Sequence, residues 1–560
     1  MTNYQFTGGT ICAPATIPGT GAISIIRVSG KEALAIADQV IDTKGVPIAE
    51  TEGYRLRYGT VFEADGSVLD NVIVSVFRAP HSYTGENSVE ISCHASRFIV
   101  NKILELLVNA GARIAAPGEF TRRAFVNGKM DLAQAEAVAD VIASQSAASH
   151  RVAMNQLKGG FSSELKVLRE KLLTMTSLLE LELDFSEEDV EFASRKELGQ
   201  LVDDSLTHIG RLTASFSRGN AIKNGVPVAI VGATNTGKST LLNALLGEER
   251  AIVSDIAGTT RDTIEETLNI DGILFRFIDT AGIRETDETI EKIGIDRTFK
   301  KLGEAAVVLG MTDLSRGEAA VLEDADFILS KVNEMGGVKN VGTENDGSET
   351  GGASLAGTGG TTPAETGGTT PAETGGTTPA ETGGASQHSH GDGQERKVVI
   401  LVNKCDVAGD FYRDDNGTGY GSGNDFVEKM AEIGDNKNVN HDNNIVSLIE
   451  NKYDNCKVIP ISAKTGKGLS TLTKTLGEIG SEITGSTDET LVTNVRHYEA
   501  LVRAASALDR VRAGLHIATL PPDLIAQDLR EALYHLGEIV GEITTDETLG
   551  NIFRNFCVGK

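Results

Sequence analysis

The pattern of apolar and polar residues divides the chain into segments of three kinds. Over residues 1 to about 125, short β-rich runs such as "AISIIRVSG" and "NVIVSVFRA" alternate with helical stretches such as "SRFIVNKILELLVNAGA". Strands and helices that follow one another in this way are typical of an α+β domain. We therefore predict an N-terminal domain over residues 1–127.

Helical patterning begins at about residue 130 and returns near the end of the chain. The stretch "DLAQAEAVADVIASQSAASHRVAMNQL" is rich in alanine and contains no proline. Apolar residues also recur at spacings of three and four, which places them on one face of a helix. They are Leu165, Leu168, Leu172, Met175, Leu179 and Leu183, and later Leu529, Leu533, Leu536 and Ile539. We predict one helical domain in two pieces, residues 128–224 and 485–560.

Residues 225–484 follow a third pattern. The run "VPVAIVGA" is continuously apolar, as in a parallel strand covered on both faces. Strand-forming and helix-forming segments then alternate to about residue 480. The simplest architecture is an α/β domain inserted into the helical domain, which makes the whole chain a multidomain α/β protein.

Two low-complexity inserts interrupt the α/β domain. The first, at about 334–395, repeats "TTPAETGG" with a period of eight, and the second, at about 408–452, is rich in Asp, Asn and Gly. Such compositions bury too little apolar surface to fold by themselves. We predict surface loops, which a domain tolerates because the entropy of loop closure grows slowly with length.

Composition narrows the class of protein. The chain has 560 residues and a net charge of −27, which argues against a surface that coats nucleic acid. Its five cysteines are scattered and form no CxxC pair, so a disulfide framework or zinc site is not expected. No apolar run reaches the roughly 18 residues of a membrane span, and the N-terminus lacks a signal-peptide pattern. We predict a cytoplasmic protein without membrane contact.

The segment "GATNTGKS" at residues 232–239 fits the phosphate-binding pattern G-x-x-x-x-G-K-[ST]. It lies between an apolar strand and the helix "TLLNALLG", which is the context the motif requires. Lys238 would reach the β and γ phosphates, and Ser239 would bind Mg²⁺. "GTTRD" then supplies Thr260 as a second magnesium contact, and "DTAG" supplies Asp279 and Gly282 near the γ-phosphate.

"NKCD" at residues 403–406 and "SAK" at 462–464 identify the base. Asp406 can accept the N1 proton and the 2-amino group of guanine, whereas adenine offers neither donor, so we predict GTP over ATP. Asn403 and Lys404 would shape the pocket, and the Ala463 amide would meet guanine O6. The predicted GTP-binding residues are Asn235, Thr236, Gly237, Lys238, Ser239, Thr240, Ser254, Asp255, Ile256, Ala257, Gly258, Thr259, Thr260, Asp279, Thr280, Ala281, Gly282, Asn403, Lys404, Asp406, Ser462, Ala463 and Lys464.

The residue after "DTAG" raises a question about hydrolysis. Ras-type enzymes have a glutamine there that orients the attacking water, whereas this chain has Ile283. An isoleucine side chain cannot hold a water. Hydrolysis therefore needs another group for the water and another positive charge for the transition state.

Both ends of the chain, together with the α/β domain, resemble the MnmE (also called TrmE) family of bacterial tRNA-modification GTPases. The matching segments are "TICAPATIPGTGAISIIRVSG", "PGEFTRRAFVNGKMDLAQAEAVADVI" and the terminal "FCVGK". The resemblance covers the chain except for the two inserts. It implies a folate-binding N-terminal domain that dimerises, a helical domain and an inserted Ras-like α/β G domain.

The resemblance also implies partners and a reaction. With an FAD-containing MnmG-like partner, in a heterotetramer, such a protein adds an aminomethyl or carboxymethylaminomethyl group at C5 of the wobble uridine (position 34) of certain tRNAs. A tetrahydrofolate derivative supplies the carbon, and FAD comes only through the partner. Carried over by position, the folate contacts are Arg27, Glu90, Lys129 and Lys560, and Cys557 is a thiol that could aid the modification.

The same resemblance answers the question raised by Ile283. Members of the family are activated by potassium, and the matching ligands are the Asn235 side chain and the carbonyls of Ser254, Ile256 and Thr259. A cation at that place offsets developing charge as an arginine finger does. Glu291 matches the catalytic glutamate, which would position the water when two G domains meet across the dimer.

Two departures and three alternatives stand beside this interpretation. Thr234 replaces a usual proline, and His94-Ala95-Ser96 replaces His-Gly-Gly. A ribosome-assembly GTPase is one alternative, but the chain has neither a KH-type GXXG segment nor a second G domain. A folate-dependent aminomethyl transferase with a regulatory G domain is another. A scaffold with a vestigial GTPase is the third, and the intact Lys238, Ser239, Asp279 and Asp406 argue against it.

Overall fold

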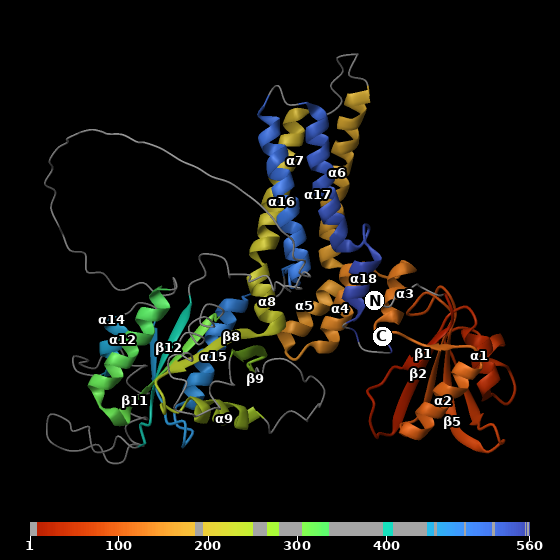
Figure 1. Cartoon of the computed structure of the whole chain (residues 1–560), viewed down its shortest axis with the longest axis horizontal. Helices are drawn as coiled ribbons and strands as arrows, with labels where there is room; N and C mark the ends of the chain where they lie inside the picture. Colours follow the sequence, from red (N-terminus) through yellow and green to blue (C-terminus); the bar gives the residue numbers. More distant parts are fainter. Residues whose placement is uncertain are drawn as a thin grey trace, which may run out of the picture. The chain divides into compact units, whose positions relative to one another are not determined.

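The computed structural model describes residues 8–184, 194–249, 266–278, 305–334, 396–406, 445–452, 456–485, 489–517, 521–554, 556 and 559. The chain divides into two compact units (Figure 1). The first comprises Met1–Val226, Asn269–Phe275 and Gly477–Lys560, and the second comprises Pro227–Leu268 and Arg276–Leu476. The second unit is thus inserted in the first, as the patterning predicts.

The N-terminal part of the first unit is a seven-stranded sheet of order β3-β4-β5-β6-β2-β1-β7. The strands are β1 (Ile11–Pro14), β2 (Ile23–Ser29), β3 (Ile41–Asp42), β4 (Arg55–Phe62), β5 (Val68–Phe77), β6 (Ser88–His94) and β7 (Arg113–Ile114). Alternate residues of β5 are buried, so one face of the sheet forms the core with α1 (Ala33–Val40) and α2 (Arg97–Asn109). The strand alternation and the helix predicted from the sequence are confirmed here.

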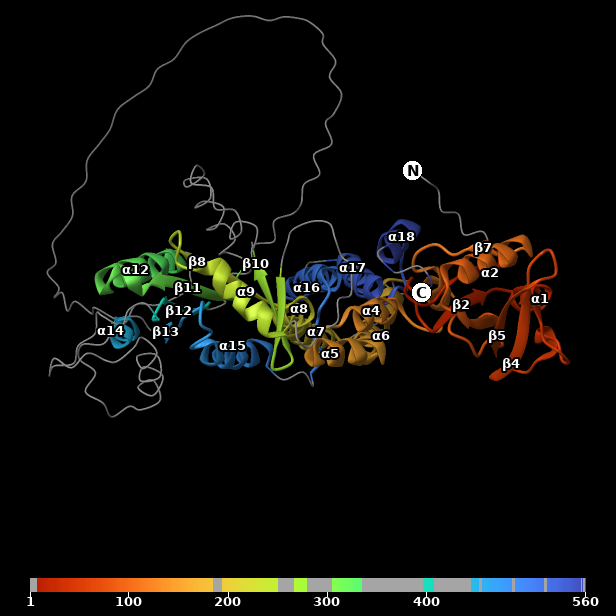
Figure 2. The same ribbon diagram turned by 90° about the horizontal axis from the view of Figure 1, so that it is seen from below.

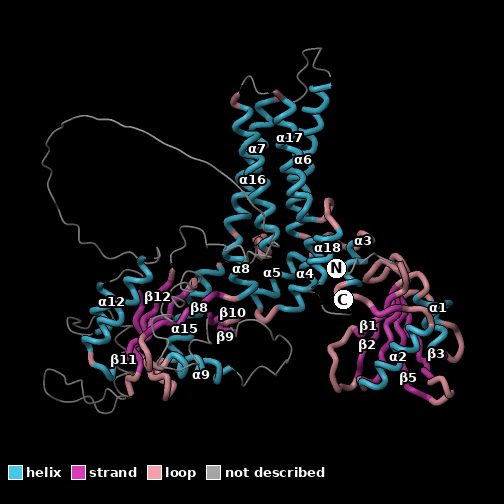
Figure 3. Tube along the Cα trace, viewed as in Figure 1, coloured by secondary structure: helices cyan, strands magenta, loops and turns pink. Residues whose placement is uncertain are grey.

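The helical part of the first unit is built from both ends of the helical sequence. Its helices are α3 (Glu119–Val126), α4 (Leu132–Ala143), α5 (Ala147–Leu157), α6 (Gly160–Asp184), α7 (Arg195–Ala214), α8 (Phe216–Asn224), α16 (Val495–Leu515), α17 (Pro522–Val540) and α18 (Asp546–Arg554). In Figures 1 to 3, α6, α7, α16 and α17 lie side by side. The predicted apolar stripes on α6 and α17 meet in one core, which includes Leu172 and Leu536.

The second unit contains most of a six-stranded sheet of order β13-β12-β11-β8-β10-β9, whereas Asn269–Phe275, which include parts of β9 and β10, belong to the first unit. The strands are β8 (Val226–Gly232), β9 (Glu266–Ile270), β10 (Ile273–Ile278), β11 (Val307–Asp313), β12 (Lys397–Asn403) and β13 (Cys456–Pro460). The neighbours β8, β11, β12 and β13 pair in parallel, so their carboxyl ends share one edge. Its helices are α9 (Lys238–Glu249), α12 (Glu318–Glu334), α14 (Ile445–Lys452) and α15 (Leu469–Thr484), whose last turns belong to the first unit.

One boundary differs from the sequence-based expectation. Composition predicts that the second insert extends to about residue 452, but α14 occupies Ile445–Lys452. Its Ile449 is buried in the apolar cluster that covers one face of the sheet. A helix therefore begins at Ile445, because the short apolar run "IVSLIE" has a helical face that the Asn- and Asp-rich composition of the preceding sequence obscures.

Candidate nucleotide-binding site

The predicted phosphate loop lies between β8 and α9, at the carboxyl edge of the second unit's sheet. Two positions of this loop require glycine, because other segments of the protein approach its backbone closely. A Cβ on Gly232 would lie 2.3 Å from the Met311 carbonyl oxygen, and one on Gly237 would lie 2.4 Å from Asn403 Nδ2. Both glycines have positive φ, which L side chains rarely adopt. The loop is thus a narrow cradle of backbone that only glycine permits.

Lys238, the first residue of α9, lies over this loop. Its Nζ donates to the carbonyl oxygens of Gly232 (2.9 Å) and Ala233 (2.7 Å). Burial lowers the pKa of the Lys238 ammonium. Asn235 is exposed at the tip of the loop with a φ of 62°. The cradle therefore combines close backbone, a helix N-terminus and one ammonium, which is the chemistry that holds a polyphosphate.

Asn403, the last residue of β12, joins the phosphate loop to the base side. Its Nδ2 donates to the Thr236 carbonyl oxygen (2.7 Å), and its Oδ1 accepts from the Ala463 amide (3.0 Å). Asp406 accepts a hydrogen bond from the Ser462 hydroxyl (2.7 Å), which fixes the carboxylate. Three segments that the sequence predicts to work together are therefore brought to one place.

The sequence assigns the Ala463 amide to guanine O6. In the structure this amide donates to Asn403 Oδ1 (3.0 Å), and its contact with guanine stays a prediction. Lys464, the next residue, is exposed.

Asp313 is a site residue that sequence reasoning missed. Its Oδ2 lies 2.7 Å from Lys404 Nζ, and its Oδ1 accepts from the Ser315 amide and hydroxyl. Burial opposes ionisation, but Lys404 and Ser315 hold the pKa of Asp313 below its usual value. The residue ends β11 directly opposite Asn403 in the parallel register. The only sign of it in the sequence is a single acidic residue at the end of an apolar strand.

Several predicted residues lie outside the part of the chain that the structure describes. They are Ser254, Asp255, Ile256, Ala257, Gly258, Thr259, Thr260, Asp279, Thr280, Ala281, Gly282, Glu291, Cys557 and Lys560. Of the P-loop residues that follow Lys238, Ser239 is partly buried and Thr240 is exposed at the start of α9. The described half of the site is therefore the P-loop and base side.

A second candidate site lies on the N-terminal sheet. Arg27 on β2 stands directly opposite Glu90 on β6, and their side chains form an ion pair of 2.8 Å. The Arg27 guanidinium also lies 5.1 Å from the centre of the Tyr83 ring and 5.7 Å from that of Phe120. The two predicted folate contacts therefore share one polar and aromatic surface.

The C-terminal turn and Lys129 border the same surface. Arg27 Nη1 lies 3.5 Å from the Gly559 carbonyl oxygen, and a Cβ on Gly559 would lie only 1.9 Å from the Pro14 carbonyl oxygen. Lys129 Nζ donates to the Pro80 carbonyl oxygen (3.1 Å), in the loop that also carries Tyr83. Arg27 thus lies beside Tyr83 and Lys129 beside Pro80, and Glu90 pairs with Arg27. Two cations and a carboxylate at one surface fit an anionic ligand with N–H groups.

The His94-Ala95-Ser96 departure is accommodated locally. Ser96 has a φ of −98° and a ψ of 132°, an extended conformation open to any residue, and it directly precedes α2. Ala95 is buried, 3.7 Å from the Cβ that an alanine at Gly21 would carry. Neither residue needs the conformational freedom of glycine here.

The part of the chain that the structure describes lacks two further features. No cluster of three or more His, Cys, Asp or Glu side chains that could hold a metal occurs among the described residues. No helix among them has both the length and the apolar character to cross a membrane.

Comparisons with known proteins agree across the chain. Residues 10–129 match the model of the GTP-binding protein TrmE N-terminus, and residues 132–557 match that of the MnmE helical domain. Proteins named tRNA modification GTPase MnmE from Parabacteroides distasonis and Bacteroides thetaiotaomicron are each 44% identical over 98% of this chain, covering 100% and 99% of their own lengths. The namesake from Christiangramia forsetii is 43% identical over 98% of this chain and 99% of its own.

Among solved structures, the FeoB G domain from Methanococcus jannaschii is similar over 46% of this chain and 97% of its own, with 17% sequence identity and a TM-score of 0.22. The family models and the relatives decide the matter. The chain belongs to the MnmE (TrmE) family.

Proposed function

We propose that this protein is a potassium-activated GTPase that, with an FAD-containing MnmG-like partner, modifies C5 of the wobble uridine in certain tRNAs. Its relatives carry the name tRNA modification GTPase, and the chain spans nearly their whole length. GTP hydrolysis in tRNA modification is accordingly its activity. The observation that carries the proposal is Asn403, whose side chain bonds both the phosphate loop and the base side.

The described geometry supports GTP binding. The Gly232–Gly237 cradle and the N-terminus of α9 face the phosphates, and Lys238 neutralises them. Asp406, oriented by Ser462, accepts the two guanine protons that adenine lacks. Ser239 and Thr260 would hold a magnesium ion, which would supply positive charge against the phosphates.

Hydrolysis without a Ras-type glutamine requires two other groups. We assign the first to a potassium ion held by Asn235 and by the carbonyls of Ser254, Ile256 and Thr259, which would offset charge on the phosphates. The exposure of Asn235 at the loop tip suits such a ligand. Glu291 would position the water through hydrogen bonds as two G domains meet.

The N-terminal surface supports a role in binding a tetrahydrofolate derivative. Arg27, Lys129 and the terminal Lys560 suit the glutamyl carboxylates, and Glu90 suits the N–H groups of the pterin. Cys557 belongs to the same terminal segment as Gly559, which lies beside Arg27. These residues bind and orient the folate, while the FAD is supplied by the partner.

The outer face of the N-terminal sheet supports a homodimer. Leu56, Tyr58 and Ile73 are 67%, 68% and 49% exposed, although β4 and β5, which carry them, are not edge strands of the sheet. They face away from α1 and α2, and the opposed residues Leu56, Ser75, Glu90 and Arg27 run across this same face. A second copy would cover the apolar surface. We place this homodimer, in a heterotetramer with the MnmG-like protein, in the bacterial cytoplasm.

The proposal predicts that GTP turnover depends on the monovalent cation. Wild type should hydrolyse GTP at least about tenfold faster in KCl than in NaCl, because removing a single charge-stabilising group costs about 10² or more in rate. Asn235→Ala should lose that difference, and Glu291→Ala should lose turnover in both salts while still binding GTP.

The measurement is steady-state phosphate release at equal ionic strength, with fluorescent GDP binding as the control for fold. Equal rates in KCl and NaCl would contradict the potassium assignment. An unimpaired Glu291→Ala variant would contradict the assignment of the water.

A further inference from the structure

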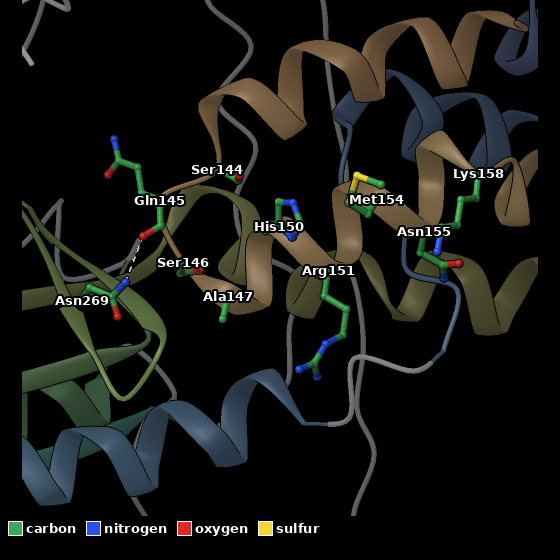
Figure 4. Close-up of a pocket in the computed structure, with 10 residues that line it drawn as sticks. All are labelled: Ser144, Gln145, Ser146, Ala147, His150, Arg151, Met154, Asn155, Lys158 and Asn269. Carbon is green, nitrogen blue, oxygen red and sulfur yellow. Dashed lines mark hydrogen bonds between the residues drawn. The ribbon is translucent and has the colours of Figure 1, made fainter.

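A basic hollow lies on the helical part of the first unit, and none of the residues that line it belongs to the two sites described above. It has a volume of about 900 Å³ and is formed by the turn between α4 and α5, by α5 itself and by Asn269 of β9 (Figure 4). Its lining residues are Ser144, Gln145, Ser146, Ala147, His150, Arg151, Met154, Asn155, Lys158 and Asn269. We call this surface the α5 hollow.

The lining of the α5 hollow has an unusual chemistry for this chain. Asp and Glu outnumber Lys and Arg by 79 to 52 in the whole protein, yet none of the described residues that line the hollow is acidic. Three lining side chains, His150, Arg151 and Lys158, carry or can carry positive charge. Most of the others are hydroxyls and amides, and only Ala147 and Met154 among these described residues are apolar. This mixture of cations and neutral donors is the one that proteins use on phosphates and sugars.

The positive groups follow the exposed side of α5. His150, Met154 and Lys158 are spaced by four residues, and Arg151 and Asn155 form the adjacent row, as Figure 4 shows. From residue 150 to 158 a helix rises about 12 Å, whereas a nucleic-acid strand carries a phosphate every ~3.4 Å of duplex axis. The row is therefore long enough to contact more than one phosphate.

The α5 hollow is also held in shape by its own hydrogen bonds. Ser146 and Ser149 form a capping box at the start of α5. Gln156 Nε2 donates to the Ala133 carbonyl oxygen (3.1 Å), and Gln134 Nε2 donates to that of Leu157 (3.0 Å), which fixes α5 against α4. Asn269 Nδ2 donates to the Gln145 carbonyl oxygen (2.9 Å). A surface that already has its bound shape loses less conformational entropy when it binds a ligand.

Neighbouring cations outside the hollow are neutralised by acids. Lys223 pairs with Asp140 (2.8 Å), and Arg218 pairs with Glu489 (2.7 Å). His150 and Lys158, in contrast, make no ion pair with any residue that the structure describes. The Lys158 ammonium and the His150 ring are thus available to a ligand.

We propose that the α5 hollow binds consecutive phosphates of the tRNA backbone. The inference rests on the proposed function, which supplies tRNA as the polyanion. Contacts of this kind position an RNA without reading its sequence. A protein partner fits less well, because the described lining offers only two apolar residues to bury.

The test uses the full-length protein and an unmodified tRNA with a wobble uridine, labelled for fluorescence anisotropy. The variant Arg151→Ala/Lys158→Ala removes two positive charges from the hollow. The control Lys166→Ala/Lys171→Ala removes two from exposed side chains on α6. Binding is measured over a series of salt concentrations, and hydrogen exchange of peptides covering residues 144–158 is followed with and without tRNA.

The hollow variant should bind tRNA about tenfold or more weakly, and the slope of log affinity against log salt should fall by about one for each phosphate that the variant no longer neutralises. The control should bind as wild type, and tRNA should slow exchange over 144–158. Wild-type affinity in the hollow variant, an equal weakening in the control, or no tRNA binding by wild type would overturn the inference. So would loss of self-association or of binding to the flavoprotein with tRNA affinity kept, because the hollow would then serve a protein.

GTP hydrolysis separates this inference from the proposed function. The hollow variant should hydrolyse GTP at the wild-type rate, since neither residue belongs to the nucleotide site. Absence of GTP hydrolysis in wild type would overturn the proposed function itself. Normal hydrolysis with unchanged tRNA affinity in the variant would overturn only the assignment of the hollow.

Discussion

Gly237→Ala is expected to weaken GTP binding by at least about 100-fold. The new Cβ would lie 2.4 Å from Asn403 Nδ2, and the residue would keep a φ of 100°. Backbone strain of this kind costs about 1–3 kcal/mol. Displacing Asn403 also costs its bonds to Thr236 and Ala463, at about 1–3 kcal/mol for each buried group left unsatisfied. Since about 1.4 kcal/mol is tenfold in affinity, the sum exceeds 100-fold.

Titration with fluorescent GTP and GDP analogues measures this effect, and Gly247→Ala is the matched control. Gly247 belongs to α9, is exposed and has no atom within 4 Å of an added Cβ. Alanine there should favour the helix by up to about 1 kcal/mol and leave affinity unchanged. Wild-type affinity in Gly237→Ala would contradict the role of Asn403 as the link between phosphate loop and base.

Glu136→Ala is expected to destabilise the first unit by about 3–5 kcal/mol. Glu136 of α4 lies 2.9 Å from Arg496 Nε and 2.7 Å from His497 Nε2, both on α16. Burial favours the neutral acid, but His497 and Arg496 hold the pKa of Glu136 at about 2, so the carboxylate is ionised at neutral pH. Removing the Glu136 carboxylate leaves the Arg496 guanidinium without its partner, and breaking a buried ion pair in this way costs about this much.

The pairing joins α4 and α16, which lie on either side of the inserted unit in the sequence. Its loss should therefore speed hydrogen exchange in these two helices and also lower the stability of the first unit. Hydrogen exchange of peptides from α4 and α16, together with the urea midpoint, measures the change. Glu170→Ala, at an exposed position on α6, is the control and should alter stability by less than about 0.5 kcal/mol. An equal loss of stability in the two variants would contradict the stabilisation that we assign to the Glu136 ion pair.

Much of the nucleotide site could be predicted because its parts lie at the ends of consecutive parallel strands. The P-loop, Asn403 and Ser462 each follow a strongly apolar run, and such ends meet at one edge of a sheet. Asp313 was missed because a single acid after "VVLGMT" matches no motif. Its contact with Lys404 depends on its position opposite Asn403 in the sheet. The use of the Ala463 amide by Asn403 likewise depends on the packing of two loops.

The first unit shows the same limit of sequence reasoning. Its helical stripes and strand alternation follow from local periodicity, and the structure confirms them. The pairing of Arg27 with Glu90 depends on the register of two strands 63 residues apart in sequence. The pairing of Glu136 with Arg496 spans 360 residues and closes across the inserted unit. Neither pairing has a local signal, because each arises only when distant elements pack.

The most direct test of the central claim is mass spectrometry of wobble uridines in tRNA from cells that lack this protein. We predict that C5 modification is lost in those cells, is restored by the wild-type chain and by Gly247→Ala, and is not restored by Gly237→Ala. This result would tie modification to the nucleotide site. Normal C5 modification in cells without the protein would contradict the account.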